Sequence, residues 1–360
     1  MQLIITLILA LSFVSTCLCK RWNLVDRNDN IYNVMQYGAR GDGKSDDSQA
    51  FLTAWNSTCE AQGAATLVIP PRLSFLVNNL IFTGPCKATS ITIQVISVNG
   101  LTIDGHNSGS IDGYGSTWWE CRSCARPIAV YFNHCNNLTV NNLRVSNSAG
   151  AHIAINGCNG ATFSRLLVDA PRTSPNTDGF NIASSKNILI QDSKISTGDD
   201  CIAINGGSSY INATRLVCGP GHGISIGLGK DHSYETVEEV HVHNCTFIGT
   251  TNGARIKTFL GGSGYARKIT FDQIYLQNVR NPIIIDQHYG VKVSEVTYHG
   301  IDGTSASDIA IKLDCSSLGC SNIVMDQINI VSSQKEKKVN AFCQNLQGTI
   351  ESTVPKVSCT

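Results

Sequence analysis

The sequence has few charged residues, no net charge and, beyond its first residues, no long hydrophobic run. Only 15% of its 360 residues are charged, and 27 Lys and Arg balance 27 Asp and Glu. Because a balanced chain has no overall field that attracts nucleic acid or a membrane surface, we expect neither as a partner. No segment approaches the ~20 apolar residues of a membrane-spanning helix. The 42% of hydrophobic residues suffices for a large core and excludes a disordered chain.

The first residues differ in composition from the rest of the chain. An apolar run extends from Leu3 to Val14, and small residues with Cys17 and Cys19 follow it. This pattern is typical of a signal peptide cleaved near Cys19, although no Lys or Arg precedes the run. A buried N-terminal strand is the alternative. We therefore predict a signal peptide over residues 1–19 and a single folded domain over residues 20–360.

Cysteines and glycosylation sequons also indicate secretion. The chain has 15 cysteines, and loss of Cys17 and Cys19 leaves 13, which suits a disulfide framework with at least one free thiol. The Cys121-x-x-Cys124 spacing resembles half of a zinc site, but without a second such pair a disulfide or two separate bridges is favoured. Four N-x-S/T sequons predict glycosylation at Asn56, Asn137, Asn212 and Asn244.

Between about residues 95 and 333 the sequence repeats one short pattern. Segments such as "NLTVNNLRV", "NILIQDSKI" and "KITFDQIYL" alternate apolar with polar residues, as strands with one buried face do. They return at intervals of about 22 to 30 residues, which is a solenoid period, whereas the blades of a β-propeller need about 40. We predict an all-β fold, a right-handed single-stranded parallel β-helix in which each repeat forms one coil.

The ends of such a solenoid need covers, because exposed strand edges aggregate. Residues 46–62 have apolar side chains at Ala50, Phe51, Ala54 and Trp55. This spacing predicts an amphipathic helix that caps the N-terminal end, with Asp46 or Asp47 as its N-cap. The tail with Cys343 and Cys359 is expected to cover the other end.

Two adjacent carboxylates stand in an otherwise apolar stretch, "STGDDCIAI", at Asp199 and Asp200. Asp178, Asp200 and His222 are 22 residues apart in turn, so stacked coils place them in one column with Asp199 beside it. Neighbouring carboxylates push at least one pKa upward, which lets one carboxyl donate a proton while another accepts one. We therefore expect an acid and a base on one surface of the solenoid.

Two cations follow in "NGARIKTF", where Arg255 and Lys257 have the same parity on a strand and so face the same side. Cations aimed into a site of carboxylates indicate an acidic substrate, because Arg recognises a carboxylate with a fork of donors. An internal salt-bridge network among these same residues is the alternative.

Four motifs in this order, "NTDGF", "GDDC", "GHGISIG" and "RIK", resemble the signature motifs of the polygalacturonases, glycoside hydrolase family 28. The contexts "YGARGDGKSDDSQAF", "FTGPCK", "IDGYGSTWW" and "NPIIIDQHYG" resemble the plant branch, and the similarity covers about residues 30 to 335. The resemblance implies a right-handed parallel β-helix that hydrolyses α-1,4-linked galacturonan with inversion, without metal or cofactor. It implies a secreted enzyme of the cell wall that acts on pectin, and we expect a monomer.

The resemblance also implies a role for each matching residue. Asp199 is expected to be the general acid on the glycosidic oxygen, and Asp178 and Asp200 are expected to activate the attacking water. His222 is expected to hydrogen-bond within the carboxylate group and tune it.

Four further matches are implied to bind or support the substrate site. Arg255 and Lys257 are expected to hold a galacturonate carboxylate, Asn176 to support Asp178, and Tyr289 to contact the sugar. Four disulfides are implied as well: Cys201–Cys218, Cys315–Cys320, Cys343–Cys359 and Cys59–Cys86. Gly290 stands where plant members usually have a cysteine, and "SIGLGK" is one residue shorter than the common plant form.

Three other functions compete with this interpretation. Ser225 in G-x-S-x-G matches the nucleophile elbow of esterases, but isoleucines alternate around it as in a plain strand. A pectate lyase would use the carboxylates for calcium, and a non-catalytic pectin-binding wall protein would keep only the fold. His241 and His243 have the spacing of metal ligands, although an exposed strand face explains them better.

Overall fold

The computed structural model describes residues 30–360 except residues 72, 78–81, 83–85, 122 and 288–289. The predicted signal peptide and Tyr289 therefore lie outside the described residues. No helix in the described part of the chain is long and apolar enough to cross a membrane.

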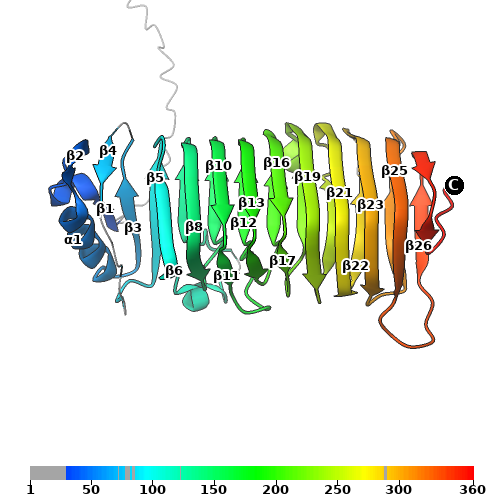
Figure 1. Cartoon of the computed structure of the whole chain (residues 1–360), viewed down its shortest axis with the longest axis horizontal. Helices are drawn as coiled ribbons and strands as arrows, with labels where there is room; N and C mark the ends of the chain where they lie inside the picture. The colour runs from blue at the N-terminus through cyan, green and yellow to red at the C-terminus, as the bar shows by residue number, and fades with distance from the viewer. Residues whose placement is uncertain (1–29, 72, 78–81, 83–85, 122, 288–289) are drawn as a thin grey trace, which may run out of the picture.

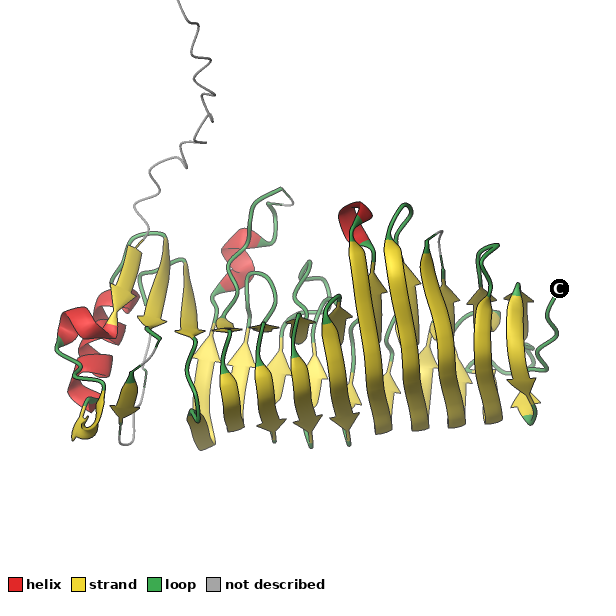
Figure 2. Ribbon diagram, turned by 90° about the horizontal axis from the view of Figure 1, so that it is seen from above, coloured by secondary structure: helices red, strands yellow, loops and turns green. Residues whose placement is uncertain are grey.

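The described chain winds into a right-handed parallel β-helix, which confirms the predicted fold. Its coils follow one another along a rod, from α1 at one end to the C-terminus at the other (Figure 1). Parallel strands of successive coils build a 12-stranded sheet, called sheet 1, and a 14-stranded sheet, called sheet 2, within the described residues. Figure 2 shows the long strands of the C-terminal half side by side.

Sheet 1 consists, in spatial order, of β1 (Asn30–Asn33), β3 (Ala64–Ile69), β5 (Ser90–Ile96), β7 (Val130–Asn133), β9 (Ile153–Asn156), β12 (Phe180–Ala183), β15 (Ile202–Asn205), β18 (Ile224–Leu228), β20 (Asn252–Thr258), β22 (Asn281–Asp286), β24 (Ile309–Asp314) and β26 (Asn340–Gln344). Sheet 2 contains β6 (Thr102–Asp112), β8 (Asn136–Ser146), β10 (Asn159–Ser164), β11 (Leu167–Asp169), β13 (Lys186–Gln191), β14 (Lys194–Ser196), β16 (Ser208–Thr214), β17 (Val217–Cys218), β19 (Tyr234–Ile248), β21 (Ser263–Val279), β23 (Val291–Ser305), β25 (Cys320–Ser332), β27 (Leu346–Ile350) and β28 (Thr353–Val354). The remaining elements are β2 (Asp42–Asp46), which pairs with β4 (Ser74–Leu76), the helix α1 (Ser48–Cys59) and the 3-10 turns η1 (Val34–Tyr37), η2 (Gly115–Trp118) and η3 (Lys230–His232).

Alternation of apolar and polar residues places one face of most strands of the two sheets inside the rod. Ile182, Ile204 and Ile226 stack through registered neighbours of sheet 1 and are fully buried. Aromatic side chains pack across the interior, where Phe163 of sheet 2 lies edge-on against both Phe132 and Phe180 of sheet 1. Stacked isoleucines and rings from both sheets thus form one continuous core, and its burial stabilises the stack of coils.

Sheet register decides which outward residues of different coils become neighbours. Phe180, Ile202 and Ile224 pair directly across β12, β15 and β18. Residues two positions before these three therefore lie on neighbouring coils at the start of their strands, and those residues are Asp178, Asp200 and His222. The 22-residue spacing in the sequence corresponds to this column.

The N-terminal end of the rod is covered by α1, as predicted (Figure 1). Ala50, Phe51, Ala54 and Trp55 are buried on its inner face. Asp47 occupies the N-cap position, but its side chain makes no capping bond to the helix. Its carboxylate instead accepts hydrogen bonds from the backbone N–H groups of Arg40 and Gly41, which fixes the preceding loop.

Candidate active site

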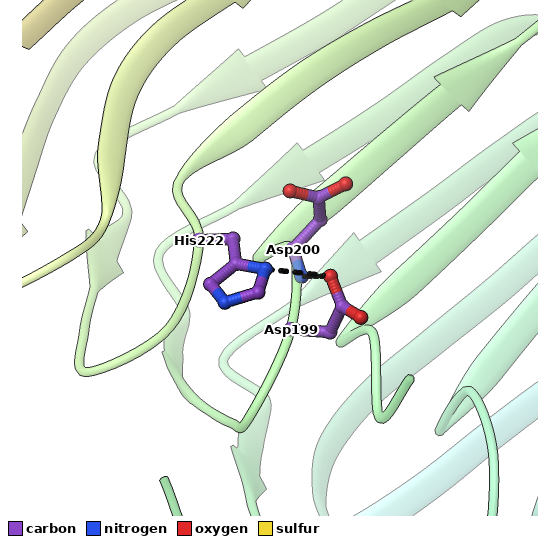
Figure 3. Close-up of side chains that lie close together, drawn as sticks. All are labelled: Asp199, Asp200 and His222. Carbon is purple, nitrogen blue, oxygen red and sulfur yellow. Dashed lines mark hydrogen bonds and ion pairs between the residues drawn. The ribbon is translucent and has the colours of Figure 1, made fainter. Parts of the chain in front are cut away.

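Asp199 and His222 are joined directly, just before strands β15 and β18 of sheet 1. The Nδ1 of His222 lies 2.9 Å from Oδ1 of Asp199 and donates to it. The backbone N–H of His222 also donates to the carbonyl of Asp199 at 2.7 Å. Figure 3 shows this contact and shows the carboxylate of Asp200 pointing in a different direction from that of Asp199. The adjacent residues Asp199 and Asp200 therefore place their carboxylates on two different sides of the cluster.

One backbone N–H joins the carboxylates of Asp178 and Asp199. The N–H of Asp200 donates to Oδ1 of Asp199 at 2.9 Å and to Oδ1 of Asp178 at 3.2 Å. The two acceptor oxygens can therefore be at most about 6 Å apart, because they share a donor. The sequence-derived column and its flanking aspartate thus form one interacting group.

The three carboxyls of this group have different protonation behaviour. Burial, and then the charges of Asp199 and Asp200, raise the pKa of Asp178 to about 7. Burial also raises the pKa of Asp200, against the opposing charge of Lys257. Burial acts in the same direction on Asp199, but the hydrogen bond and charge of His222 outweigh it and leave its pKa below the usual value. The same hydrogen bond raises the pKa of His222.

Asp200 is the most deeply buried of the three carboxylates, with 3% of its surface exposed. The hydroxyl of Ser225 donates to its Oδ1 at 2.7 Å, and Nζ of Lys257 lies 3.6 Å from its Oδ2. Ser225 is thus occupied with the carboxylate. It lies within the regular strand β18 rather than on a strand-to-helix turn, so the geometry of an esterase nucleophile is absent there.

Arg255 and Lys257 both lie on β20 and face outward beside the carboxylates. Arg255 pairs in register with Ser225, and Lys257 with Gly227. The Nε of Arg255 is buried and has no hydrogen-bond partner within the described part of the chain. A buried donor without a partner is costly, so this arrangement suits a ligand that brings its own acceptor. An internal salt-bridge network accounts for the contact between Lys257 and Asp200 but leaves this donor of Arg255 unexplained.

The expectation that Asn176 supports Asp178 is wrong. The Nδ2 of Asn176 donates to Oδ2 of Asp199 at 3.2 Å. Asp178 instead accepts a hydrogen bond from Nδ2 of Asn181 at 3.1 Å. Asn176 precedes the strand in a left-handed conformation, with φ of 54°, which turns its side chain toward the next coil. Asn181 lies on the outward face of β12, and the alternation of that strand is the signal that identifies it.

Asp199, Asp200 and His222 offer ligand atoms within 4.8 Å of one another, the spacing of a possible metal site. Calcium requires six to eight oxygen ligands, and this group provides two carboxylates and an imidazole. Lys257 also places an ammonium group beside Asp200. These donors suit proton transfer better than a cation, and the expectation that no metal is needed stays a prediction.

The two histidines with the spacing of metal ligands, His241 and His243, lie outside this cluster. His241 and His243 are exposed on β19, and they approach different carboxylates. Nδ1 of His243 lies 2.7 Å from Asp272, whereas Nε2 of His241 lies 3.8 Å from Glu239. Their arrangement is therefore that of a polar strand face.

The structure contains five disulfides among the described residues. The four pairs that the resemblance implies are present, and the fifth joins Cys121 to Cys124. Three cysteines are free and buried, which agrees with the expected free thiol: Cys135, Cys158 and Cys245. All four sequon asparagines are exposed, so their glycosylation stays a prediction that the structure permits.

Comparison with known proteins identifies the family of this chain. The model of glycosyl hydrolases family 28 matches residues 83–353. The chain belongs to this family. A probable polygalacturonase of Arabidopsis thaliana is 43% identical, over 92% of this chain and 81% of the relative. Polygalacturonase-2 of Solanum lycopersicum is 38% identical, over 89% of this chain and 79% of the relative.

Solved structures with the same fold include two carbohydrate-active enzymes. The endo-xylogalacturonan hydrolase of Aspergillus tubingensis has a TM-score of 0.65 at 24% identity and covers 92% of this chain and 98% of its own. Endopolygalacturonase I of Stereum purpureum, complexed with two galacturonates, has a TM-score of 0.56 at 22% identity and covers 82% and 87%. At these identities the likeness shows the β-helix fold alone.

Proposed function

We propose that this family 28 protein is a polygalacturonase, which hydrolyses α-1,4 linkages between galacturonate residues of pectin. One observation carries the proposal: three interacting carboxyls with divergent pKa shifts lie beside two cations on the same face. Carboxyls with such different environments can divide acid and base roles. Arg255 and Lys257 supply the complement to a substrate that carries a carboxylate on every sugar.

In the proposed reaction, Asp199 gives its proton to the glycosidic oxygen, while Asp178 and Asp200 take a proton from the attacking water. In the free protein the raised pKa belongs to Asp178, and His222 favours the ionised form of Asp199. The reaction therefore requires the proton to reside on Asp199 once the sugar is bound. Bound sugar favours this state, because it removes water from Asp199 and presents an ether oxygen that accepts only from the protonated acid.

The disulfides and the exposed sequons support a proposal on the cellular location of the protein. Five disulfides form in an oxidising compartment, and the exposed sequons are accessible to glycosylation. We therefore place the protein outside the cell, in the cell wall, as a monomer that binds pectin or polygalacturonate without a cofactor. Tyr289, the remaining expected contact to the sugar, stays a prediction.

The deciding experiment follows viscosity and reducing ends together while the protein acts on polygalacturonate in the presence of a chelator. A rapid fall in viscosity with few new ends would indicate internal cleavage, and steady release of monomer would indicate cleavage from a chain end. Formation of new ends without an ultraviolet-absorbing product supports hydrolysis. Cleavage that requires calcium and creates that product would indicate a lyase, and binding without cleavage would indicate a wall-binding protein.

A further inference from the structure

The loop that precedes β7 reaches across one whole coil to Asn176, a hydrogen-bond partner of the candidate general acid. Arg126 lies in this loop, and its Nη1 donates to the carbonyl of Pro175 while its Nη2 donates to Oδ1 of Asn176. Arg126 and Asn176 are 50 residues apart in the chain, with the coil that contains β9 between them. Nδ2 of the same Asn176 donates to Oδ2 of Asp199. The three side chains therefore form one continuous hydrogen-bonded row.

The backbone that carries Arg126 is held in place at several points. A disulfide joins Cys121 to Cys124, three residues further along the loop. The Nε1 of Trp119 donates a hydrogen bond to the carbonyl of Ser148 at 3.0 Å. The N–H of Gly150 donates to the carbonyl of Pro127 at 2.9 Å. Figure 2 shows η2, the helical turn at the start of this loop, projecting from the side of the rod. The loop is thus a fixed arm rather than a free connection.

The segment that Arg126 contacts lies directly on the residue before Asp199. A Cβ added to Gly198 would lie 1.9 Å from the carbonyl oxygen of Ser174, so these backbones are in close contact. The N–H of Gly198 also donates to the hydroxyl of Thr177 at 3.1 Å. A displacement of residues 174–176 would therefore be transmitted to Gly198 and Asp199.

We infer that Arg126 is a positioning residue for Asp199, an inference that rests on the proposed function. A guanidinium can only donate hydrogen bonds, so Arg126 requires the oxygen of the Asn176 amide to face it. The NH₂ of that amide then faces Asp199. A donor in this place favours the ionised carboxylate, whereas a reversed amide would present an oxygen to Asp199. Arg126 thereby sets both the location and the proton affinity of the acid through Asn176.

The test compares Arg126→Gln and Arg126→Lys with Arg172→Gln, which removes the same charge from an exposed position four residues before Asn176. We expect Arg126→Gln to lower kcat at least about tenfold with KM changed less than about threefold, because displacement of Asp199 from the glycosidic oxygen costs more than its raised proton affinity gains. Arg126→Lys should also lose activity, because one ammonium cannot hold both acceptors as a planar fork does. Arg172→Gln should retain the wild-type rate.

A double-variant comparison tests the route through Asn176. If Arg126 acts through that amide, its loss should have no further effect once the amide is gone. The single variant Asn176→Ala and the double variant that adds Arg126→Gln should then have the same kcat within about twofold. Losses that multiply would overturn the inference. A rise in KM with an unchanged kcat would overturn it as well, since that result describes a residue that only binds substrate.

A measurement without substrate separates this inference from the proposed function. In protein labelled with ¹³C-aspartate, the Asp199 carboxyl is assigned with Asp199→Asn and titrated in each folded variant. The pKa of Asp199 should rise in Arg126→Gln relative to Arg172→Gln, because the amide is released from its orientation. An unchanged pKa would overturn the inference even if the wild type cleaves polygalacturonate. A wild type that produces no new ends would reject the proposed function, whatever the titration shows.

Discussion

The imidazole of His222 and the carboxylate of Asp199 are bonded at 2.9 Å across two neighbouring coils. This bond joins residues 23 positions apart in the chain, and it lowers the pKa of Asp199 while it raises the pKa of His222. The proposed acid therefore has its protonation controlled by a residue of another coil. The role of Asp199 can be tested by a substitution that removes its acidic proton and keeps the shape of its side chain.

Asp199→Asn should lower the rate of polygalacturonate hydrolysis by about 10²- to 10⁴-fold, the usual range for loss of a general acid or base. Asp192→Asn is a matched control, because Asp192 is paired with Arg215 at an exposed corner. Reducing-end assays give the rates, and circular dichroism checks the fold. If Asp199→Asn retains more than about a tenth of the wild-type rate, the acid is another residue.

Ser225→Ala distinguishes a supporting hydroxyl from a nucleophile. The hydroxyl donates to Asp200 at 2.7 Å, and loss of a hydrogen bond to a charged group costs about 1.5–3 kcal/mol. We expect a reduced but measurable rate of hydrolysis, lower by about ten- to a hundredfold on that basis. The assay measures reducing ends and methanol released from methyl-esterified pectin. Methanol release by the wild type that disappears in Ser225→Ala would identify an esterase instead.

Asp178 should make the folded state less stable as the pH rises. Its pKa of about 7 in the folded protein lies above the ordinary aspartate value of 3.8, so the folded state binds a proton that the unfolded state releases between about pH 4 and pH 7. Stability falls with pH in this window, because the unfolded state binds fewer protons. The loss reaches about 1–4 kcal/mol above pH 7.

Asp178→Asn removes this titration and keeps the shape of the side chain. Its free energy of unfolding should exceed that of the wild type at pH 8 by more than it does at pH 4, as measured by denaturant unfolding. Parallel stability curves for the two proteins from pH 4 to pH 8 would contradict the raised pKa of Asp178.

The disulfide between Cys201 and Cys218 should matter for activity as well as stability. Cys201 follows Asp200 directly, and Cys218 lies four residues before His222, so the bond joins two coils of the site. The Cys343–Cys359 bond closes a loop of nearly the same length, with a sequence separation of 16 against 17. Replacing either pair with serine should therefore cost a similar free energy of unfolding, about 3 kcal/mol.

The activities of these two double-serine variants should differ. Loss of Cys201–Cys218 should lower kcat at temperatures where the protein stays folded, whereas loss of Cys343–Cys359 should not. Equal kcat values for the two variants would show that the bond beside Asp200 only stabilises the fold.

The stereochemistry of the product tests the roles of Asp178 and Asp200. One oxygen of Asp178 and one of Asp199 accept from the same N–H, so these two oxygens are at most about 6 Å apart. The two carboxyl groups of typical inverting enzymes are separated by ~6.5–9.5 Å. Inversion therefore depends on Asp200 as a second base that holds the water with Asp178. We expect the β-anomer of the new reducing end first in proton NMR spectra of the early reaction. The α-anomer first would indicate a carboxylate nucleophile and retention.

Much of the site follows from periodicity alone. A 22-residue spacing aligns Asp178, Asp200 and His222 because parallel coils repeat in register, and strand parity places Arg255 and Lys257 on one side. Asn181, on the outward face of β12, is identifiable from the same alternation. These residues lie in regular strands or two residues before a strand begins, where sequence distance translates directly into position.

The parallel β-helix, its capping helix and the column of Asp178, Asp200 and His222 are predictable from the sequence, because alternation and period specify which side chains stack. The contact of Asn176 with Asp199, and that of Arg126 with Asn176 from 50 residues away, emerge only in the folded protein. The loops between coils vary in length and conformation, so no period relates their residues. Their contacts arise from the packing of one folded loop on the next.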